Sequence, residues 1–172
     1  MSYKYYWWAL AVVIVGSFVV LGGVGRKIIS QAPPLPDVYT TEGHLLLTGS
    51  SITDGQGVWQ SIVGQEIGTV WGHGAYVAPD WSADWLHRES ESILDTWAVR
   101  QGATNFAALD QDHQDLFKAR LVREMRTNTY DPSSNRVTID RDRAAAFGQL
   151  ATYYADVFAT GRAEYAIPRC IN

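Results

Sequence analysis

The residues most able to do chemistry gather in one stretch, GTVWGHGAYVAPDWSADWLHRE at positions 68–89. Within it, Asp80, Asp84 and His87 have the spacing i, i+4 and i+7, so a helix would bring all three to one face, where they could bind a metal ion or exchange protons. The same spacing fits a solvated polar face, with Asp80 favoured near a helix start by the helix dipole. Spacing alone leaves both interpretations open.

His73 of the same stretch lies between two glycines, which let other groups approach the backbone closely. The setting suits a ligand carbonyl or a metal-binding imidazole, and it equally suits a hydrogen-bonded structural histidine. The sequence contains no HExxH or GxSxG pattern, and its glycines form neither GxGxxG nor a GK[ST] phosphate loop. Spacing therefore predicts no catalytic set. So many aromatic side chains in one segment predict either a core or a covered surface.

The composition restricts the classes of protein that the chain can belong to. Its 172 residues can bury one core of ordinary size. With 18 acidic residues against 14 Lys and Arg, the net charge of −4 argues against a nucleic-acid partner. Cys170 is the single cysteine, so the chain has no disulfide framework, no thiolate cluster and no CxxCH for covalent haem.

The start of the chain reads as a membrane helix. Residues 5–25 carry no charge, and WWALAVVIVGSFVVLGGV is long enough to span the roughly 30 Å hydrocarbon layer. Aromatic rings precede the run and Arg26 with Lys27 follow it, as in interfacial anchors. The alternative is a cleaved signal peptide, but the run exceeds the usual apolar core of about 7–15 residues and no A-x-A pattern follows. We predict an uncleaved anchor over residues 1–29 and a proline-rich linker over residues 30–37.

Residues 38–172 are predicted to be mainly α-helical with a small β-hairpin. The hairpin is expected around Glu42 and Gly43. The turn YDPSSN and the segment RVTI predict at most one further short strand. The first expected helix starts at Thr53 or Asp54 and ends at Gly64, and the second has Pro79 in its first turn, with Trp81 and Trp85 one turn apart. A third helix is expected from a Ser92-x-x-Asp95 cap to Gly102. Two more are expected over residues 110–126 and from an Asp140 cap to Gly161.

Three segments, ITDGQGVWQSIVGQEIGTVWGHGAYVAPDWSADWLHRE, MRTNTYDP and RAEYAIPR, resemble the N-terminal region of the quinol-dependent nitric oxide reductases of the haem-copper oxidase superfamily. The resemblance covers nearly the whole chain. It implies a membrane anchor and a cytochrome c-like helical domain that has lost its haem. In that family a neighbouring bundle of membrane helices holds two haems b and a non-haem iron, and reduces two NO to N2O with electrons from quinol.

The resemblance also implies which residues replace those that bind haem in related proteins. Aligning GQEIGTVWGHGAYVAPD with the cytochrome c subunit of related reductases puts Gly64, Ile67 and Gly68 where the two cysteines and the histidine of CxxCH stand. None of these residues can bind haem covalently or ligate its iron. We therefore expect side chains to fill the porphyrin space, with Trp59 and Trp71 as candidates, and other rings to face the haem-bearing helices.

A calcium site is a further implication of the resemblance. The glycine and tyrosine of the family's GAY segment help to hold calcium near the haem propionates, and they correspond to Gly74 and Tyr76. Tyr76 is also a candidate contact to a propionate of the catalytic part. A glycine carbonyl is a suitable hard ligand for calcium. The family's glutamate between the glycines is His73 here, which changes the charge at that position.

The expected role follows from what the resemblance covers. The family continues for several hundred residues beyond the position of IPRCIN. We therefore expect this chain to bind no haem and to be inactive alone, and to serve as anchor and lid beside catalytic helices that bring haem b, non-haem iron and calcium. The alternatives are a stand-alone membrane-anchored binding module that uses its aromatic surface for another partner, and a secreted domain released by signal cleavage.

The expected location is the bacterial inner membrane, spanned once, with the soluble domain on the periplasmic face. The resemblance implies this orientation. The basic residues beside the apolar run mildly favour the opposite one, because Lys4 precedes the run and two basic residues follow it. One or two charges are weak evidence, so the resemblance decides the expectation.

Overall fold

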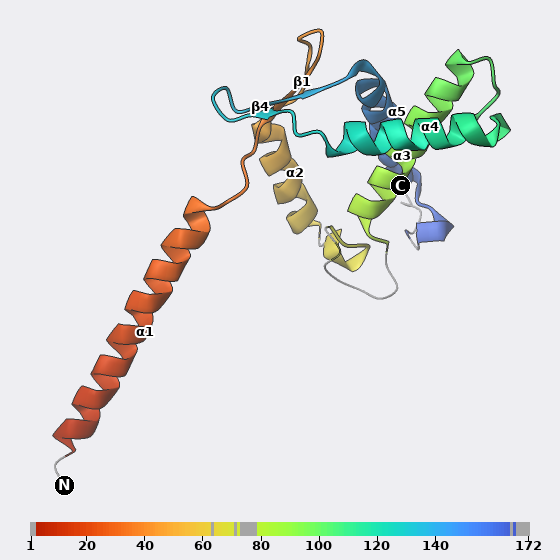
Figure 1. Cartoon of the computed structure of the whole chain (residues 1–172). Helices are drawn as coiled ribbons and strands as arrows, with labels where there is room; N and C mark the ends of the chain where they lie inside the picture. Colours follow the sequence, from red (N-terminus) through yellow and green to blue (C-terminus); the bar gives the residue numbers. More distant parts are fainter. Residues whose placement is uncertain (1–2, 63, 71, 73–78, 166, 168–172) are drawn as a thin grey trace. The chain divides into compact units, whose positions relative to one another are not determined.

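The computed structural model describes residues 3–167 except 63, 71, 73–78 and 166 (Figure 1). Its contacts divide the chain into two units, Met1–Pro34 and Leu35–Asn172. Helix α1, Lys4–Ser30, makes up most of the first unit. Its mean hydropathy reaches 2.2 and no residue along it is buried, so it is long and apolar enough to cross a membrane.

The second unit is mainly helical and carries a small sheet, as the sequence predicts. Its elements are β1 Asp37–Thr40, β2 Leu45–Leu47, α2 Gly49–Ser61, η1 Gly64–Glu66, α3 Trp81–Arg100, η2 Phe106–Ala108, α4 Gln111–Arg126, β3 Tyr130–Asp131, β4 Arg136–Ile139, α5 Arg141–Thr160 and η3 Ala163–Tyr165.

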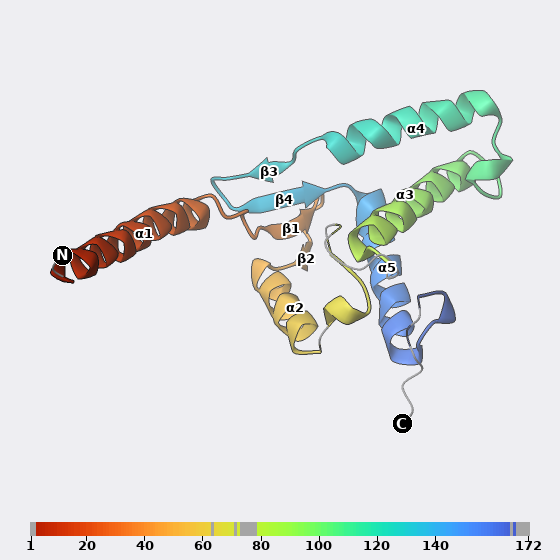
Figure 2. The same ribbon diagram turned by 90° about the horizontal axis from the view of Figure 1, so that it is seen from below.

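The sheet is larger than the predicted hairpin. The hairpin exists, because β1 pairs antiparallel with β2. However, β1 also pairs in parallel with β4, which pairs with β3, and the strand order is β2-β1-β4-β3 (Figure 2). The segment RVTI is thus an inner strand. Its partner lies about a hundred residues away along the chain, so no local pattern could reveal the pairing.

Side-chain caps fix the helix starts. Asp110 caps α4 by accepting from the backbone N–H of His113, and Asp140 caps α5 by accepting from those of Asp142 and Arg143. Both starts confirm the sequence prediction, and α5 ends before Gly161 as expected. Carboxylates at these positions bond the free N–H groups of the first turn and favour its dipole.

Three other predicted helix starts are wrong. Helix α2 begins at Gly49 rather than near Thr53, because the Thr48 hydroxyl accepts from Ser51 N–H and caps it there. Pro79 precedes the first turn of α3, whose N-cap is Asp80. Ser92 caps nothing, because α3 continues through it, and its hydroxyl instead donates to Gln149 of α5.

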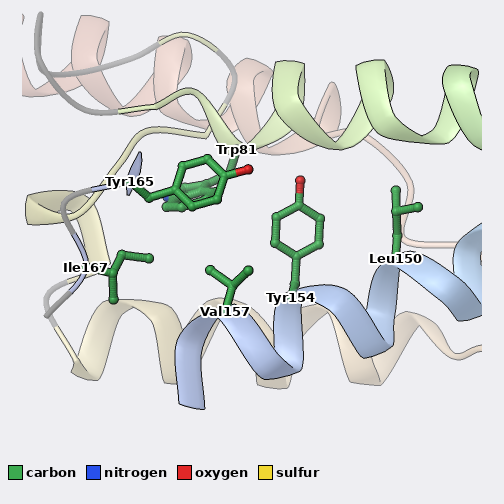
Figure 3. Packing of buried hydrophobic residues seen from close by; sticks show 6 residues of the cluster. All are labelled: Trp81, Leu150, Tyr154, Val157, Tyr165 and Ile167. Carbon is green, nitrogen blue, oxygen red and sulfur yellow. The ribbon is translucent and has the colours of Figure 1, made fainter. Parts of the chain in front are cut away.

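Two hydrophobic clusters hold the helices together. One gathers the start of α3, the second half of α5 and the segment after it (Figure 3). The other joins the second half of α3 to α4 and the first half of α5, with Ile93, Trp97, Phe117 and Leu121 buried. The buried faces of the two helices carry Phe117 and Leu121 on α4, and Leu150, Tyr154 and Val157 on α5.

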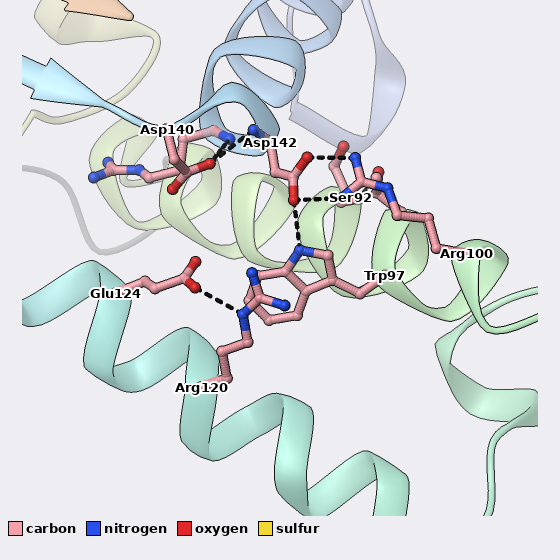
Figure 4. A network of polar contacts seen from close by, with 9 residues as sticks. Ser92, Trp97, Arg100, Arg120, Glu124, Asp140 and Asp142 are labelled. Carbon is pink, nitrogen blue, oxygen red and sulfur yellow. Dashed lines mark hydrogen bonds and ion pairs between the residues drawn. The ribbon is translucent and has the colours of Figure 1, made fainter. Parts of the chain in front are cut away.

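One carboxylate links helices at the second cluster. Asp142 of α5 accepts from Trp97 Nε1 at 2.8 Å and from the Arg100 guanidinium, both on α3 (Figure 4). The hydrogen bonds from Arg100, helped by the bond from Trp97, hold the pKa of Asp142 below its usual range despite partial burial. Arg120 of α4 lies 4.0 Å from the centre of the Trp97 ring.

Candidate functional site

An aromatic cluster surrounds the first turn of α3. It consists of Trp59, Trp81, Trp85, Tyr154, Phe158 and Tyr165. Trp81 lies at its centre, 9% exposed, with ring centroids 5.0 Å from Tyr165, 5.3 Å from Phe158 and 6.1 Å from Tyr154 (Figure 3). Tilted and edge-on pairs at these separations are favourable ring geometries. The cluster therefore packs as a core at this end of the unit.

Two glycines, Gly64 and Gly68, lie directly beneath indole rings of this cluster. A Cβ on Gly64 would come closer than 3.0 Å to the Trp59 ring, and a Cβ on Gly68 would come closer than 3.0 Å to Nε1 of Trp81. Both glycines are buried. Because no real Cβ tolerates such distances, the rings occupy the space that any side chain at these positions needs.

The backbone around α3 holds Trp81 in place. Trp81 N–H donates to the Thr69 carbonyl at 2.8 Å, and Thr69 N–H donates to the Pro79 carbonyl at 2.9 Å. Asp80 caps the helix through Ser82 N–H at 2.9 Å. These bonds bring residue 69 beside residues 79–81 and set the Trp81 ring over Gly68. The Trp81 Nε1 is buried without a hydrogen-bond partner among the described residues.

Asp84 forms the polar edge of the cluster. Its Oδ2 accepts from Tyr154 at 2.6 Å, from Tyr165 at 2.9 Å and from Arg88 Nε at 3.0 Å. Burial alone raises the pKa of Asp84, but these three hydrogen bonds outweigh it and hold the pKa below its ordinary value. Burial and the bond to Asp84 raise the pKa of Tyr154, so that the phenol stays protonated at neutral pH.

The i, i+4, i+7 carboxylates and histidine do not form a site. Asp80 caps α3, and Asp84 accepts hydrogen bonds from two tyrosines. His87 Nε2 lies 3.3 Å from a carboxylate oxygen of Glu91, and both side chains are exposed. Among the described residues no group of three His, Cys, Asp or Glu is placed to hold a metal ion. The three residues thus have separate partners. Asp84 belongs neither to a metal or proton-exchange site nor to a solvated polar face, the two interpretations that its spacing allowed.

The predicted site residues outside α3 fall into those that the structure does not describe and one that packs against the cluster. His73, Gly74 and Tyr76, with Trp71, lie outside the described residues. Trp59 packs against the cluster as a half-buried ring, edge-on to Phe158 at 6.3 Å. Sequence reasoning missed Trp81 as the ring over Gly68. The one signal for it was the pairing of two tryptophans four residues apart at a helix start.

A covalently bound haem does not fit this site. The residues that the resemblance aligns with the family's attachment positions are Gly64, Ile67 and Gly68, which offer neither a thiolate nor an imidazole. In addition, indole rings lie against two of the three. The site is therefore an aromatic core in a mainly helical domain, with indole rings over the glycines at positions 64 and 68.

Comparison with known families agrees with this class. The family described as the NorB cytochrome c-like domain of nitric oxide reductase matches residues 36–172. The chain therefore belongs to that family. No curated protein matches the chain.

Proposed function

We propose that the chain is the anchor and the haem-free cytochrome c-like domain of a quinol-dependent nitric oxide reductase of the haem-copper oxidase superfamily. It covers the membrane helices that carry haem b and non-haem iron, and those helices perform the reduction of NO to N2O. The family match supports the reductase assignment, and the quinol type rests on the resemblance of the segments around Trp71 and Pro79.

The observation that carries the proposal is the packing at Gly64 and Gly68. A domain that transfers electrons through its own haem needs room for a porphyrin beside its attachment positions, whereas the Trp59 and Trp81 rings lie against the two glycines that the resemblance aligns with those positions. A quinol-using enzyme receives its electrons inside the membrane, so its outer domain is free to become structural. The rings then give the domain a core that no cofactor supplies.

We also propose that Gly74 and Tyr76 contribute to a calcium site shared with the haem-bearing helices, with Tyr76 near a propionate. The support is the resemblance, together with the backbone bonds from Thr69 to Pro79 and from Trp81 to Thr69, which close the chain on either side of the segment. Calcium suits a shared site because it accepts many oxygen ligands in flexible geometry.

The proposed location is the bacterial inner membrane, with α1 as a single span and the second unit on the periplasmic side. The length and apolarity of α1 support the span. The side of the membrane rests on the resemblance alone. Cysteine labelling of an exposed α5 position, such as Ala145→Cys in a Cys170→Ser background, by a membrane-impermeant reagent in intact cells tests this orientation.

The decisive experiment is affinity purification of the tagged chain from membranes that also contain the haem-bearing helices. We expect haem b absorption in the complex and no Soret band from the chain expressed alone. Tyr76→Ala should lower the amount of haem-bearing partner recovered, whereas Tyr130→Ala, a change on β3, should leave it unchanged. Recovery of the chain without any haem-bearing partner would favour the stand-alone binding module instead.

A further inference from the structure

The outer side of α4 carries seven exposed residues in a self-complementary order. Along the helix they are two acids, three apolar residues and two arginines: Asp112, Asp115, Leu116, Ala119, Val122, Arg123 and Arg126. Their spacing of three and four places them on one face, opposite the buried Phe117 and Leu121. We call these seven residues the outer stripe of α4.

The order of the outer stripe is symmetric about Ala119. Asp112 and Arg126 each lie seven residues from it, Asp115 and Arg123 four, and Leu116 and Val122 three. A second α4 laid antiparallel across the first therefore places each acid opposite an arginine and each apolar side chain opposite another. In such a two-fold contact residue i meets residue j and j meets i.

We propose that the outer stripe of α4 is a docking surface for a second copy of this chain, in an antiparallel helix pair centred on Ala119. A second copy fits this surface because each helix carries two acids at one end of the stripe and two arginines at the other. At the centre, the small Ala119 side chain lets the two helices approach closely. Leu116 is 62% and Val122 48% exposed in the single chain, so the contact removes apolar surface from water.

The surroundings leave the outer stripe open within the second unit. Helix α3 packs on the inner side of α4, and α4 runs along the edge of the unit in Figure 2. Among the described residues, the side chains of Asp112, Arg123 and Arg126 form no hydrogen bond or ion pair. Asp115 Oδ1 accepts from Gln111 Nε2 at 2.8 Å and lies 3.8 Å from Lys118 Nζ, both on the same helix. These contacts are exposed, so the second Asp115 oxygen is open to an arginine across the interface.

The small size of the outer stripe predicts a weak contact between two copies, and anchoring both copies in one membrane favours it. A 16-residue helix is only about 24 Å long, so one helix pair buries less than the roughly 1,200 Å² of a standard stable interface. Exposed ion pairs add little each and are weakened by salt. Two copies held in one membrane by α1 meet at a raised effective concentration, which favours a contact of this strength.

Disulfide trapping of the whole chain in membranes tests the proposal. In a Cys170→Ser background, Ala119→Cys should form a disulfide-linked dimer under mild oxidation, because the two-fold axis brings residue 119 of both copies together. Ala145→Cys, an exposed alanine on α5, is the matched control and should stay monomeric. No dimer from Ala119→Cys, or an equal yield from Ala145→Cys, overturns the proposal.

A charge exchange separates this docking mode from chance collision. Arg123→Glu, added to the Ala119→Cys chain, should lower the dimer yield at least about threefold, because like charges then face each other twice. Adding Asp115→Arg restores opposite charges and should return the yield toward the starting level. Failure of the double change to restore the yield, or cross-links mainly to another protein, also overturns the proposal. None of these outcomes depends on the reductase assignment.

Discussion

The indole ring of Trp81 lies against the α-carbon of Gly68, with Nε1 closer than 3.0 Å to the point where a Cβ would stand. Thirteen positions separate the two residues, and the bond from Trp81 N–H to the Thr69 carbonyl brings them together. The contact makes the glycine a requirement of the core.

Gly68→Ala should therefore destabilise the second unit by about 1–3 kcal/mol, because the added methyl group forces the Trp81 ring out of its packing position. Thermal unfolding of the chain in detergent, followed by near-UV circular dichroism, measures this as a lower Tm. Gly148→Ala is the control, since a Cβ there meets nothing within 4 Å, and it should stabilise α5 by about 0.5–1 kcal/mol. Equal stability of Gly68→Ala and wild type would refute the close packing.

Trp81→Ala should cost about 3–5 kcal/mol, because it empties a buried site lined by Tyr154, Phe158 and Tyr165. Trp59→Ala should cost clearly less, since its ring is half-buried at the edge of the cluster. Urea unfolding followed by far-UV circular dichroism compares the two without relying on tryptophan fluorescence. A larger loss for Trp59→Ala would mean that Trp59 carries more of the core than the packing indicates.

The depressed pKa of Asp84 gives a pH dependence with a definite sign. The unfolded chain binds the proton more readily than the folded one, so Asp84 stabilises the fold above its unfolded pKa of about 4, and this contribution disappears as the pH falls through the lower folded pKa. Asp84→Asn should lower the stability at pH 7 and flatten the fall in stability below pH 4. An acid-unfolding profile that keeps the slope of the wild type contradicts the assignment.

Asp142→Ala should destabilise the second unit by about 1–3 kcal/mol, because Trp97 Nε1 and Arg100 on α3 both lose their acceptor. Asp156→Ala, which breaks the exposed pair with Arg162, should cost no more than about 1 kcal/mol. Chemical unfolding of the two variants side by side gives the comparison. If both losses are equally small, the Asp142 contacts do not link α3 to α5 in the way Figure 4 indicates.

Features with a local cause were readable from the sequence. The apolar run predicted α1, the helical period predicted α4 over residues 110–126, and Asp140 predicted the start of α5, because a cap and a helical period involve only neighbouring residues. The same reasoning failed at Ser92, where a capping pattern lies inside a continuous helix. Packing against α5 stabilises α3 through that point, and a local pattern carries no information about it.

The sequence by itself determined the long apolar character of the first segment, the helical nature of the rest, and the absence of thiols and imidazole from positions 64, 67 and 68. The tertiary structure decided which ring lies over Gly68, that β1 pairs with β4, and that Asp84 bonds two tyrosines. The physical reason is the separation along the chain of the residues that interact. Composition, caps and periodicity act between neighbours, whereas ring packing and strand pairing join residues that only the folded chain brings into contact.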